Sequence, residues 1–326
     1  MNFSSSNQEF NLLYVGPTDI LEEIKKNIPE SWGLICVETL KEFLTNPVSV
    51  SIILDASIRD IIDLNLFEFS KVTIIGCAST GVNHIKRPVN SPRHIEIFSL
   101  RDTPEVLQKL TSAAEFSFAL LLTLAKRVIP AASAVKSGFW NRIEFPGVVL
   151  EGKKLGLIGF GRIGRAMAVY ANSFGMKVGF YDPYLTKKPL ETLEYDSIEQ
   201  LVENSDFVSI HVPYDSEKDK KPIIDEHLFA LFKQGSYFIN TSRGELIDES
   251  GLITEINSGR IQGAALDVLT NEPKIEENLI YKYAVETGAN IIFTPHIAGY
   301  SIENVRIATI GMLTHIVKKV SHKNKP

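Results

Sequence analysis

Three side chains in the last third of the sequence have the types needed to oxidise an alcohol or reduce a ketone. Arg243 follows the apolar stretch of "INTSRGELID", Glu272 lies in "LTNEP", and His296 ends "IIFTPH". A histidine can exchange a proton near neutral pH because its ordinary pKa is about 6.5. A carboxylate beside its other ring nitrogen fixes the tautomer, and an arginine can grip a substrate carboxylate through two parallel hydrogen bonds. With a hydride carrier, these residue types indicate chemistry on a 2-hydroxy acid.

Each of the three residues also has an ordinary structural interpretation when taken alone. An arginine after a strand often forms a surface salt bridge, a glutamate before a proline can begin a helix, and a single histidine is more often structural than catalytic. The functional interpretation therefore depends on a cofactor site and on elements that bring the three residues together.

A glycine-rich turn indicates such a cofactor site. Gly159, Gly161 and Gly164 form G-x-G-x-x-G in "KKLGLIGFGRIGRAMA", between an apolar stretch and a helical pattern. The first glycine permits a tight turn, the second lets the backbone approach a pyrophosphate, and the third lets the helix pack closely on the strand. The helix would begin at Arg162 and Ile163, and its free N–H groups would face the anion.

An acidic residue at the expected distance indicates which dinucleotide binds. The apolar segment "MKVGFYD" ends at Asp182, 18 residues after Gly164. A carboxylate there can accept hydrogen bonds from both hydroxyls of the adenosine ribose, and it would repel the 2′-phosphate of NADP. We therefore expect NAD, although Lys187 and Lys188 follow closely enough to leave NADP open.

The elements around these motifs predict an α/β fold with two parallel sheets. Short apolar stretches alternate with helical patterns up to about residue 100, and the alternation resumes at residue 153. Between them, residues 111–136 predict a long helix that is buried on more than one side and bent or broken at Pro130. The segment 301–320 predicts an amphipathic helix that returns to the first unit. Ligands bind beyond the carboxyl ends of such strands, where Arg243, Glu272 and His296 are all expected.

Composition bounds the remaining function classes. The chain has 326 residues, 44% of them apolar and 22% charged, with a net charge of −5, so two globular domains and no nucleic-acid surface are expected. No apolar run is long enough to span a membrane and the N-terminus does not resemble a signal peptide, which favours the cytoplasm. The two cysteines, Cys36 and Cys77, have no metal-ligand spacing, so no metal is expected.

Together the motifs resemble the D-isomer-specific 2-hydroxyacid dehydrogenases, a family that includes phosphoglycerate dehydrogenase and glyoxylate reductase. The resemblance runs from about residue 72 to 315 and is carried by "GFGRIGRAMA", "YDP", "HVP", "INTSRGELIDESGLITEINSGRIQGAALDVLTNEP" and "TPHIAG". It implies an NAD-binding Rossmann domain at 105–296. A discontinuous flavodoxin-like substrate domain would comprise 1–104 and 297–326. It also implies a homodimer, in which Trp140 either anchors the interface or packs within its own chain.

The resemblance implies a role for each residue that matches the family motifs. Arg243 would orient the substrate carboxylate and carbonyl, His296 would be the acid/base, and Glu272 would be its partner. Four further positions would contact the cofactor: Asp267 at the nicotinamide carboxamide, Thr241 in the nicotinamide pocket, and His211 with Pro213 beside the adenosine end.

In the first domain, "STGVNHI" resembles the substrate loop of the family. Backbone N–H groups around Thr80 and Gly81 would hold the substrate carboxylate, with His84 as a residue that packs the loop. The chain departs from the common pattern at Arg101, which we expect to bind a second anionic or polyhydroxyl group of the substrate. The alternative for Arg101 is a salt bridge with Asp102 or a neighbour.

The resulting prediction is an NAD-dependent enzyme that transfers a hydride between NAD(H) and a D-2-hydroxy acid or 2-keto acid. The alternative is a catalytically weak, NAD(H)-sensing regulatory protein of the same fold, similar to a co-repressor. Neither the particular acid nor the physiological direction follows from the sequence.

Overall fold

The computed structural model describes residues 9–57, 61–67, 71–82, 84–86, 94–185, 192–215 and 220–323. Lys187 and Lys188 lie outside these ranges. The chain forms two compact units, one of Met1–Leu110 with Ser301–Pro326 and one of Thr111–Tyr300. The boundaries predicted from the sequence fall after residues 104 and 296.

The first unit is built on a parallel sheet of five strands in the order β2-β1-β3-β5-β7. Counted among themselves, these strands follow the 2-1-3-4-5 order of flavodoxin-like folds. Two short strands pair separately. The strands are β1 (Phe10–Val15), β2 (Trp32–Val37), β3 (Ile52–Asp55), β4 (Ile62–Asp63), β5 (Ile74–Cys77), β6 (Ile85–Lys86) and β7 (Glu96–Phe98).

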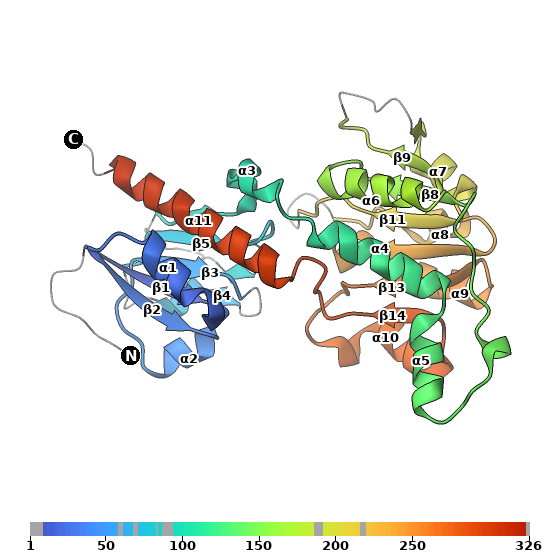
Figure 1. The fold of residues 1–326 in the computed structure, drawn as a ribbon, viewed down its shortest axis with the longest axis horizontal. Helices are drawn as coiled ribbons and strands as arrows, with labels where there is room; N and C mark the ends of the chain where they lie inside the picture. The colour runs from blue at the N-terminus through green and yellow to red at the C-terminus, as the bar shows by residue number, and fades with distance from the viewer. Residues whose placement is uncertain are drawn as a thin grey trace. The chain divides into compact units, whose positions relative to one another are not determined.

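Helices cover both faces of this sheet, and on each face a buried apolar cluster joins the helices to the strands. The last helix of the chain, α11 (Ile302–Lys323), packs against β3, β5, α1 and α3 (Figure 1), so the predicted return to the first unit is confirmed. The other helical elements are η1 (Thr18–Ile20), α1 (Leu21–Asn27), α2 (Leu40–Thr45), η2 (Leu64–Phe67), η3 (Leu100–Asp102) and α3 (Pro104–Leu107).

The second unit contains a parallel sheet of seven strands in the order β10-β9-β8-β11-β12-β13-β14. The first six strands in chain order follow the 3-2-1-4-5-6 arrangement of dinucleotide-binding sheets, and the order reverses between β8 and β11. The strands are β8 (Lys154–Ile158), β9 (Lys177–Tyr181), β10 (Leu193–Glu194), β11 (Phe207–Ile210), β12 (Ser236–Asn240), β13 (Ile261–Leu266) and β14 (Ile291–Phe293).

Two apolar clusters fill the two faces of this second sheet. One joins α4 and α6 to the strands, and the other joins α7, α8, α9 and α10 to the opposite face (Figure 1). The predicted α/β fold class is therefore confirmed. The helical elements are α4 (Ser112–Ala125), α5 (Val128–Lys136), η4 (Arg142–Glu144), α6 (Arg162–Ser173), α7 (Ile198–Asn204), α8 (Glu226–Ala230), η5 (Gly244–Leu246), α9 (Glu249–Asn257), η6 (Ile275–Glu277) and α10 (Leu279–Thr287).

The helical segment 111–136 is broken, but not where the sequence predicted. The break lies at Arg127, whose φ of 52° ends α4, and the helical axes before and after it differ by 64°. Pro130 instead lies in the first turn of α5, where the N–H that proline lacks would have had no partner in the helix. Eight residues of α4 are buried and none of α5 is, so the expected burial holds only for the first half.

Within the described ranges, no single helix is long and apolar enough to cross a membrane. The bent pair Pro104–Ala125 and Val128–Lys136 meets that criterion only when both parts are counted together, by length and composition. Because α4 is mostly buried against the sheet of its unit, its apolar character is explained by core packing.

Candidate active site

The glycine turn follows β8, at the place where the strand order reverses. Gly159 has φ +91°, and a Cβ at this position would lie 2.6 Å from the carbonyl oxygen of His211. A Cβ on Gly164 would lie 2.3 Å from the carbonyl oxygen of Gly159. Both glycines are therefore required by packing, because the backbone of α6 and the backbone after β11 approach this turn more closely than a side chain allows.

Gly161 differs because, apart from its two chain neighbours, no atom of the described residues lies within 4 Å of where its Cβ would be. It is the N-cap of α6 and has no side chain to cap the helix. Open space at the positive end of a helix of 12 residues is what a pyrophosphate needs. The turn therefore fits a dinucleotide, with the backbone of Arg162 and Ile163 beginning the helix beside it.

Two alanine substitutions should separate these roles. In Gly161→Ala the added methyl group meets no protein atom but presses on a bound pyrophosphate. If it costs about 1–3 kcal/mol, as overpacking does, the Kd for NADH rises about 5- to 150-fold while Tm changes little. In Gly164→Ala the methyl group collides with the backbone, so Tm should fall. Fluorescence titration and calorimetry measure both, and unchanged NADH affinity in Gly161→Ala would contradict the assignment.

Asp182 follows β9 and faces the glycine turn. Its Oδ2 accepts a hydrogen bond from the N–H of Phe160 at 2.9 Å, and its Oδ1 accepts one from the N–H of Tyr184 at 3.0 Å. The side chain is half-buried. The carboxylate is therefore fixed at the turn by two backbone donors, and each of its oxygens keeps capacity for a further one.

His211 follows β11 beside the same turn and is not suited to proton transfer. Its Nε2 lies 2.9 Å from the Oγ of Ser209, and its buried Nδ1 has no hydrogen-bond partner among the described residues. Burial lowers the pKa of the ring to about 3, so His211 is neutral at physiological pH. Pro213 lies two residues further on and is exposed. The backbone of His211 thus lies beside the turn, and its predicted contact with the adenosine end of a cofactor stays a prediction.

His296 and Glu272 meet beyond the ends of β14 and β13. The Nδ1 of His296 lies 2.5 Å from the Oε1 of Glu272, and about a third of each side chain is exposed. The backbone of His296 is left-handed, with φ +53°, and its N–H donates to the carbonyl oxygens of Asp267 at 2.9 Å and Thr294 at 3.0 Å. Because Nδ1 is engaged by Glu272, Nε2 is the nitrogen that remains for exchanging a proton.

Asp267 fixes the backbone around His296. It follows β13 directly and is almost completely buried, and burial raises the pKa of its carboxyl group against the effect of its hydrogen bonds. It accepts hydrogen bonds from the Oγ1 of Thr294 at 2.6 Å and from the N–H groups of Ile297 at 3.0 Å and Ala298 at 2.8 Å. The predicted contact with the nicotinamide carboxamide stays a prediction, and these bonds leave the Oδ2 of Asp267 with one donor and room for a second.

Arg243 lies in a turn after β12 that is shaped by a buried amide. Asn240 accepts a hydrogen bond from the N–H of Ser242 at 2.9 Å and donates one to the carbonyl oxygen of Arg243 at 2.9 Å. The guanidinium of Arg243 donates to the carbonyl oxygen of Ser242 at 2.6 Å. Thr241 is buried, and its hydroxyl lies 2.7 Å from that of Ser117 in α4. Sequence reasoning identified Arg243 and Thr241 but missed Asn240.

A buried carboxylate that sequence reasoning also missed holds the segment carrying Glu272. Glu249, in the first turn of α9, is only 9% exposed. It accepts hydrogen bonds from the N–H and hydroxyl of Thr270 at 3.2 and 2.8 Å, and from the amide of Asn278 at 2.7 and 2.9 Å. Thr270 and Asn278 bracket Glu272 in sequence. The sequence feature that could have indicated Glu249 is an acidic residue directly after the helix cap Asp248, in "IDESG".

The residues predicted to bind substrate in the first unit follow two neighbouring strands, with Thr80 and Gly81 after β5 and Arg101 after β7. Thr80 and Gly81 are half-buried, and the Oγ of Ser79 donates to the carbonyl oxygen of Gly81 at 2.7 Å. Arg101 is exposed and forms no ion pair with any residue in the described ranges. The carboxylate of Asp102 accepts a hydrogen bond from the N–H of Ser99 at 2.8 Å. The alternative of an Arg101–Asp102 salt bridge is therefore not found in this part of the chain.

Comparison with known proteins identifies the family of the chain. The model of the family described as "D-isomer specific 2-hydroxyacid dehydrogenase, NAD binding domain" matches residues 118–298. The chain is 37% identical over 275 residues to a glyoxylate reductase of Thermococcus litoralis, covering 81% of this chain and 77% of that protein. It is 33% identical over 304 residues to a D-3-phosphoglycerate dehydrogenase of Methanocaldococcus jannaschii, covering 92% of this chain and 54% of the relative. The chain thus spans about half the length of this second relative.

A solved structure also matches nearly the whole chain. The TT0316 protein from Thermus thermophilus is 28% identical, with a TM-score of 0.76, and the match covers 97% of this chain and 98% of that one. The glycine turn and the residues around it lie within the matched NAD-binding region. By its sequence and by its fold, the chain belongs to the D-isomer-specific 2-hydroxyacid dehydrogenases, a family of NAD-dependent oxidoreductases.

Proposed function

We propose that this chain transfers a hydride between NAD(H) and a D-2-hydroxy acid or its 2-keto acid. The observation that carries the proposal is the pair of His296 Nδ1 and Glu272 Oε1 at 2.5 Å. This pair lies at the carboxyl edge of the sheet that also carries the glycine turn and Arg243. An acid/base, a carboxylate-binding group and a dinucleotide turn at one sheet edge are the parts that this reaction needs.

In the reducing direction, the nicotinamide supplies the hydride to the carbonyl carbon when the cofactor is bound. His296 donates the proton from Nε2 to the carbonyl oxygen, which becomes the hydroxyl group. Glu272 accepts the hydrogen bond from Nδ1–H and offsets the charge of the imidazolium before transfer. Arg243 holds the substrate carboxylate and polarises the adjacent carbonyl group. Oxidation runs through the same groups in reverse, with His296 as the base.

Two further elements of the proposal lie in the first unit. Backbone N–H groups around Thr80 and Gly81 bind the substrate carboxylate, supported by the position of this segment directly after a parallel strand. The exposed guanidinium of Arg101 binds a second anionic or polyhydroxyl group, supported by its lack of an ion pair within the described residues. The N–H of Leu100 donates to the carbonyl oxygen of Ser79 at 2.9 Å, which links the two segments.

A screen of 2-keto acids with NADH and NADPH tests the proposal directly. Consumption of NADH with at least one keto acid, and reduction of NAD by the matching D-hydroxy acid but not its L-isomer, is the expected result. Protein that binds NADH tightly and consumes none across the panel would instead favour a regulatory sensor of the same fold.

Asp182 should set the choice between the two dinucleotides. Asp182→Asn keeps a hydrogen-bond acceptor but removes the charge, so the ribose hydroxyls lose charge-assisted bonds and the 2′-phosphate is no longer repelled. We expect kcat/KM with NADH to fall about 5- to 30-fold, for a loss of about 1–2 kcal/mol, and the value with NADPH to rise. Asp196→Asn, an exposed position in the same unit, is the control. An unchanged NADH/NADPH ratio would argue against this role.

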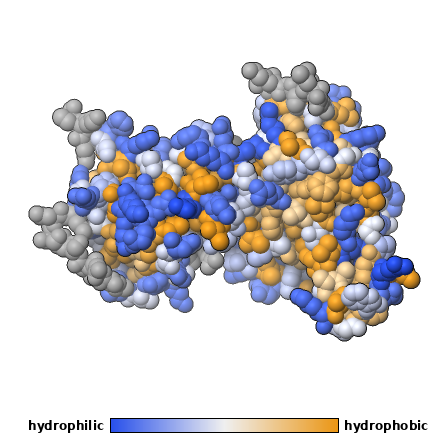
Figure 2. Space-filling view, in the orientation of Figure 1, coloured by the Kyte–Doolittle hydropathy of each residue, from blue (hydrophilic) through white to orange (hydrophobic). Residues whose placement is uncertain are grey.

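An exposed apolar surface supports the proposal of a homodimer. Trp140 is 88% exposed and Ile143 79%, so Trp140 does not pack within its own chain. Apolar residues gather on the face of the second unit that carries α4 (Figure 2). The exposed apolar side chains of α5 and the segment after it are Val128, Ile129, Val135, Phe139, Trp140, Ile143 and Val149. Patches of this kind typically mark protein–protein contacts, and a second copy of the chain would cover it.

Sedimentation of a double variant tests the homodimer. Wild-type protein should sediment at twice the chain mass, whereas Trp140→Glu with Ile143→Glu should sediment as a monomer with an unchanged far-UV spectrum, because buried charges oppose association. Tyr184→Glu with Leu193→Glu, two exposed positions near the β10 edge of the sheet and outside this surface, should remain dimeric. A monomeric wild-type protein would contradict the proposal.

The cysteines support a cytoplasmic location. Cys36 and Cys77 are both free thiols. Burial raises the pKa of both thiols, that of Cys36 to about 11, so neither is a thiolate at neutral pH in the metal-free protein. A reducing compartment preserves such thiols, and we place the enzyme in the cytoplasm on this ground.

A further inference from the structure

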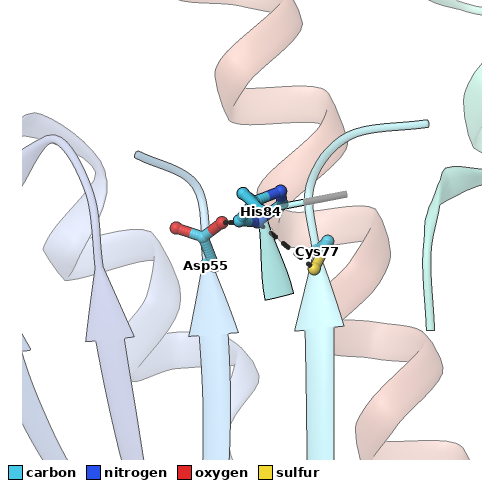
Figure 3. A group of neighbouring side chains, drawn as sticks. All are labelled: Asp55, Cys77 and His84. Atoms are coloured by element: carbon cyan, nitrogen blue, oxygen red, sulfur yellow. Dashed lines mark hydrogen bonds and ion pairs between the residues drawn. The ribbon is translucent and has the colours of Figure 1, made fainter. Parts of the chain in front are cut away.

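Three side chains of different chemistry converge in the first unit, and none of them has a proton-transfer, substrate-binding or cofactor-binding role in the proposal above. Asp55 ends β3 and Cys77 ends β5, and the two are directly paired in the register of these parallel strands. His84 follows the segment that contains Thr80 and Gly81, and its ring lies over both strand ends (Figure 3). The Nε2 of His84 lies 2.9 Å from the Oδ2 of Asp55 and 4.0 Å from the Sγ of Cys77. All three potential ligand atoms lie within 4.8 Å of one another.

The contacts in this cluster differ from those of a proton relay. Both neighbours of His84 approach the same nitrogen, Nε2, whereas a relay of acid, histidine and nucleophile uses the two opposite nitrogens. A single Nε2–H can donate to only one of them at full strength. The arrangement therefore brings one carboxylate oxygen, one sulfur and one imidazole nitrogen toward a common point.

Burial and outer hydrogen bonds also favour a ligand set. Asp55 is 1% exposed and Cys77 fully buried, and within the described residues no lysine or arginine pairs with Asp55. The Oδ1 of Asp55 accepts hydrogen bonds from the N–H of Ser57 at 3.1 Å and its hydroxyl at 2.8 Å. These bonds fix the carboxylate and direct Oδ2 toward His84, as outer partners do for metal-ligating carboxylates.

We propose that Asp55, Cys77 and His84 form a three-ligand site for a divalent transition metal ion of the Zn²⁺ class. The donor set of thiolate sulfur, imidazole nitrogen and carboxylate oxygen is the one that Zn²⁺ takes in proteins, with a fourth position for water or another ligand. On binding, the thiol of Cys77 loses its proton to solvent and His84 coordinates through Nε2 as the neutral ring, so no redox change occurs.

The metal would fasten the segment between Cys77 and His84 to the sheet at both of its ends. Cys77 directly precedes this segment and His84 closes it, while Asp55 belongs to the neighbouring strand. A bound ion would thus link the side chains of three parts of the chain, of which Asp55 and His84 already share a hydrogen bond. Its role is structural and does not depend on the hydride-transfer chemistry proposed for the second unit.

Metal binding by the full-length protein, after removal of metal with a chelator, tests the proposal. Equilibrium dialysis against Zn²⁺ should give one ion per chain, and Co²⁺ should produce absorption bands of sulfur-to-metal charge transfer. Cys77→Ser should abolish these bands. Cys77→Ser and Asp55→Asn should each weaken Zn²⁺ binding by at least about 10- to 100-fold, because loss of even a hydrogen-bond partner of a metal ligand costs that much. Zn²⁺ should raise the Tm of the wild-type protein and not that of Cys77→Ser.

The other cysteine provides a matched control. Cys36 lies in β2 and has no part in the cluster, so Cys36→Ser should bind Zn²⁺ and Co²⁺ like the wild type. Absence of stoichiometric binding in the wild-type protein, or binding that survives in Cys77→Ser, would overturn the proposal and show that the cluster is a hydrogen-bonded Asp55–His84 pair beside a thiol. None of these readouts uses enzyme activity, so this outcome is separate from any failure of the keto-acid screen.

Discussion

Replacing His296 with glutamine is expected to lower kcat for keto-acid reduction by about 10²–10⁴-fold, the range usual for loss of a general acid. Glutamine has a similar length but cannot exchange a proton near neutral pH. Because the N–H of His296, rather than its ring, bonds to Asp267, the loop should keep its shape. The Kd for NADH, measured by fluorescence titration, should therefore stay near the wild-type value while steady-state turnover collapses.

A second histidine substitution controls for general damage to the protein. His227 lies exposed in α8 of the same unit, and His227→Gln should leave kcat unchanged. If His296→Gln turned over at the wild-type rate, the proton donor would have to be another group. A variant that lost NADH binding together with turnover would show instead that the loop had moved, which circular dichroism and the crystal structure of the variant could establish.

Replacing Arg243 with lysine is expected to lower kcat/KM by about 30- to 4,000-fold, which corresponds to a loss of about 2–5 kcal/mol in transition-state stabilisation. Lysine keeps the positive charge but offers a point charge in place of a planar fork, so the substrate carboxylate loses its paired hydrogen bonds. Both parts of the constant should change, because carboxylate binding sets KM and carbonyl polarisation contributes to kcat. Steady-state kinetics over a range of keto-acid concentrations separates the two.

Arg260→Lys is the matched control for this experiment. Arg260 precedes β13 and so lies at the amino ends of the strands, whereas Arg243 follows β12 at their carboxyl ends. Arg260 binds Glu255 and the carbonyl oxygen of Phe232. Its replacement should affect Tm more than kcat/KM. Wild-type values of both constants in Arg243→Lys would mean that charge alone suffices there, and the two-bond grip on the carboxylate would have to be abandoned.

Most of the fold followed from local patterns in the sequence. The glycine turn and the apolar stretches bounded by polar turns predict strands at 153–159, 176–182, 206–212, 236–241, 261–268 and 291–295, and the second sheet has a strand within each of these ranges. The strand that was missed, β10, has two residues and no apolar pattern, and its pairing with β9 is a tertiary effect. The helix break was misplaced for a physical reason, since Pro130 is tolerated in a first turn while Arg127 adopts a left-handed backbone.

The candidate catalytic residues could be proposed from the sequence, but the groups that hold them in place could not. Arg243, Glu272 and His296 stand out because their side chains have the right chemistry at strand ends. The groups that hold them are identified only by contacts across long separations. The Oγ1 of Thr294 reaches Asp267 over 27 positions, and Asn278 reaches Glu249 over 29. No local pattern states that two such side chains will meet.

The double use of Asp182 limits how the nucleotide preference of this enzyme can be re-engineered. The same carboxylate that would recognise the ribose also braces the amide of Phe160, inside the turn that receives the pyrophosphate. Replacing Asp182 with alanine or glycine would enlarge the space for a 2′-phosphate but would leave the amide of Phe160 without its acceptor. If no water replaces that acceptor, the folded protein loses about 1–3 kcal/mol of stability. A change of preference to NADP that preserves the stability of the fold would therefore place asparagine or serine at position 182 and add the phosphate-binding cation elsewhere.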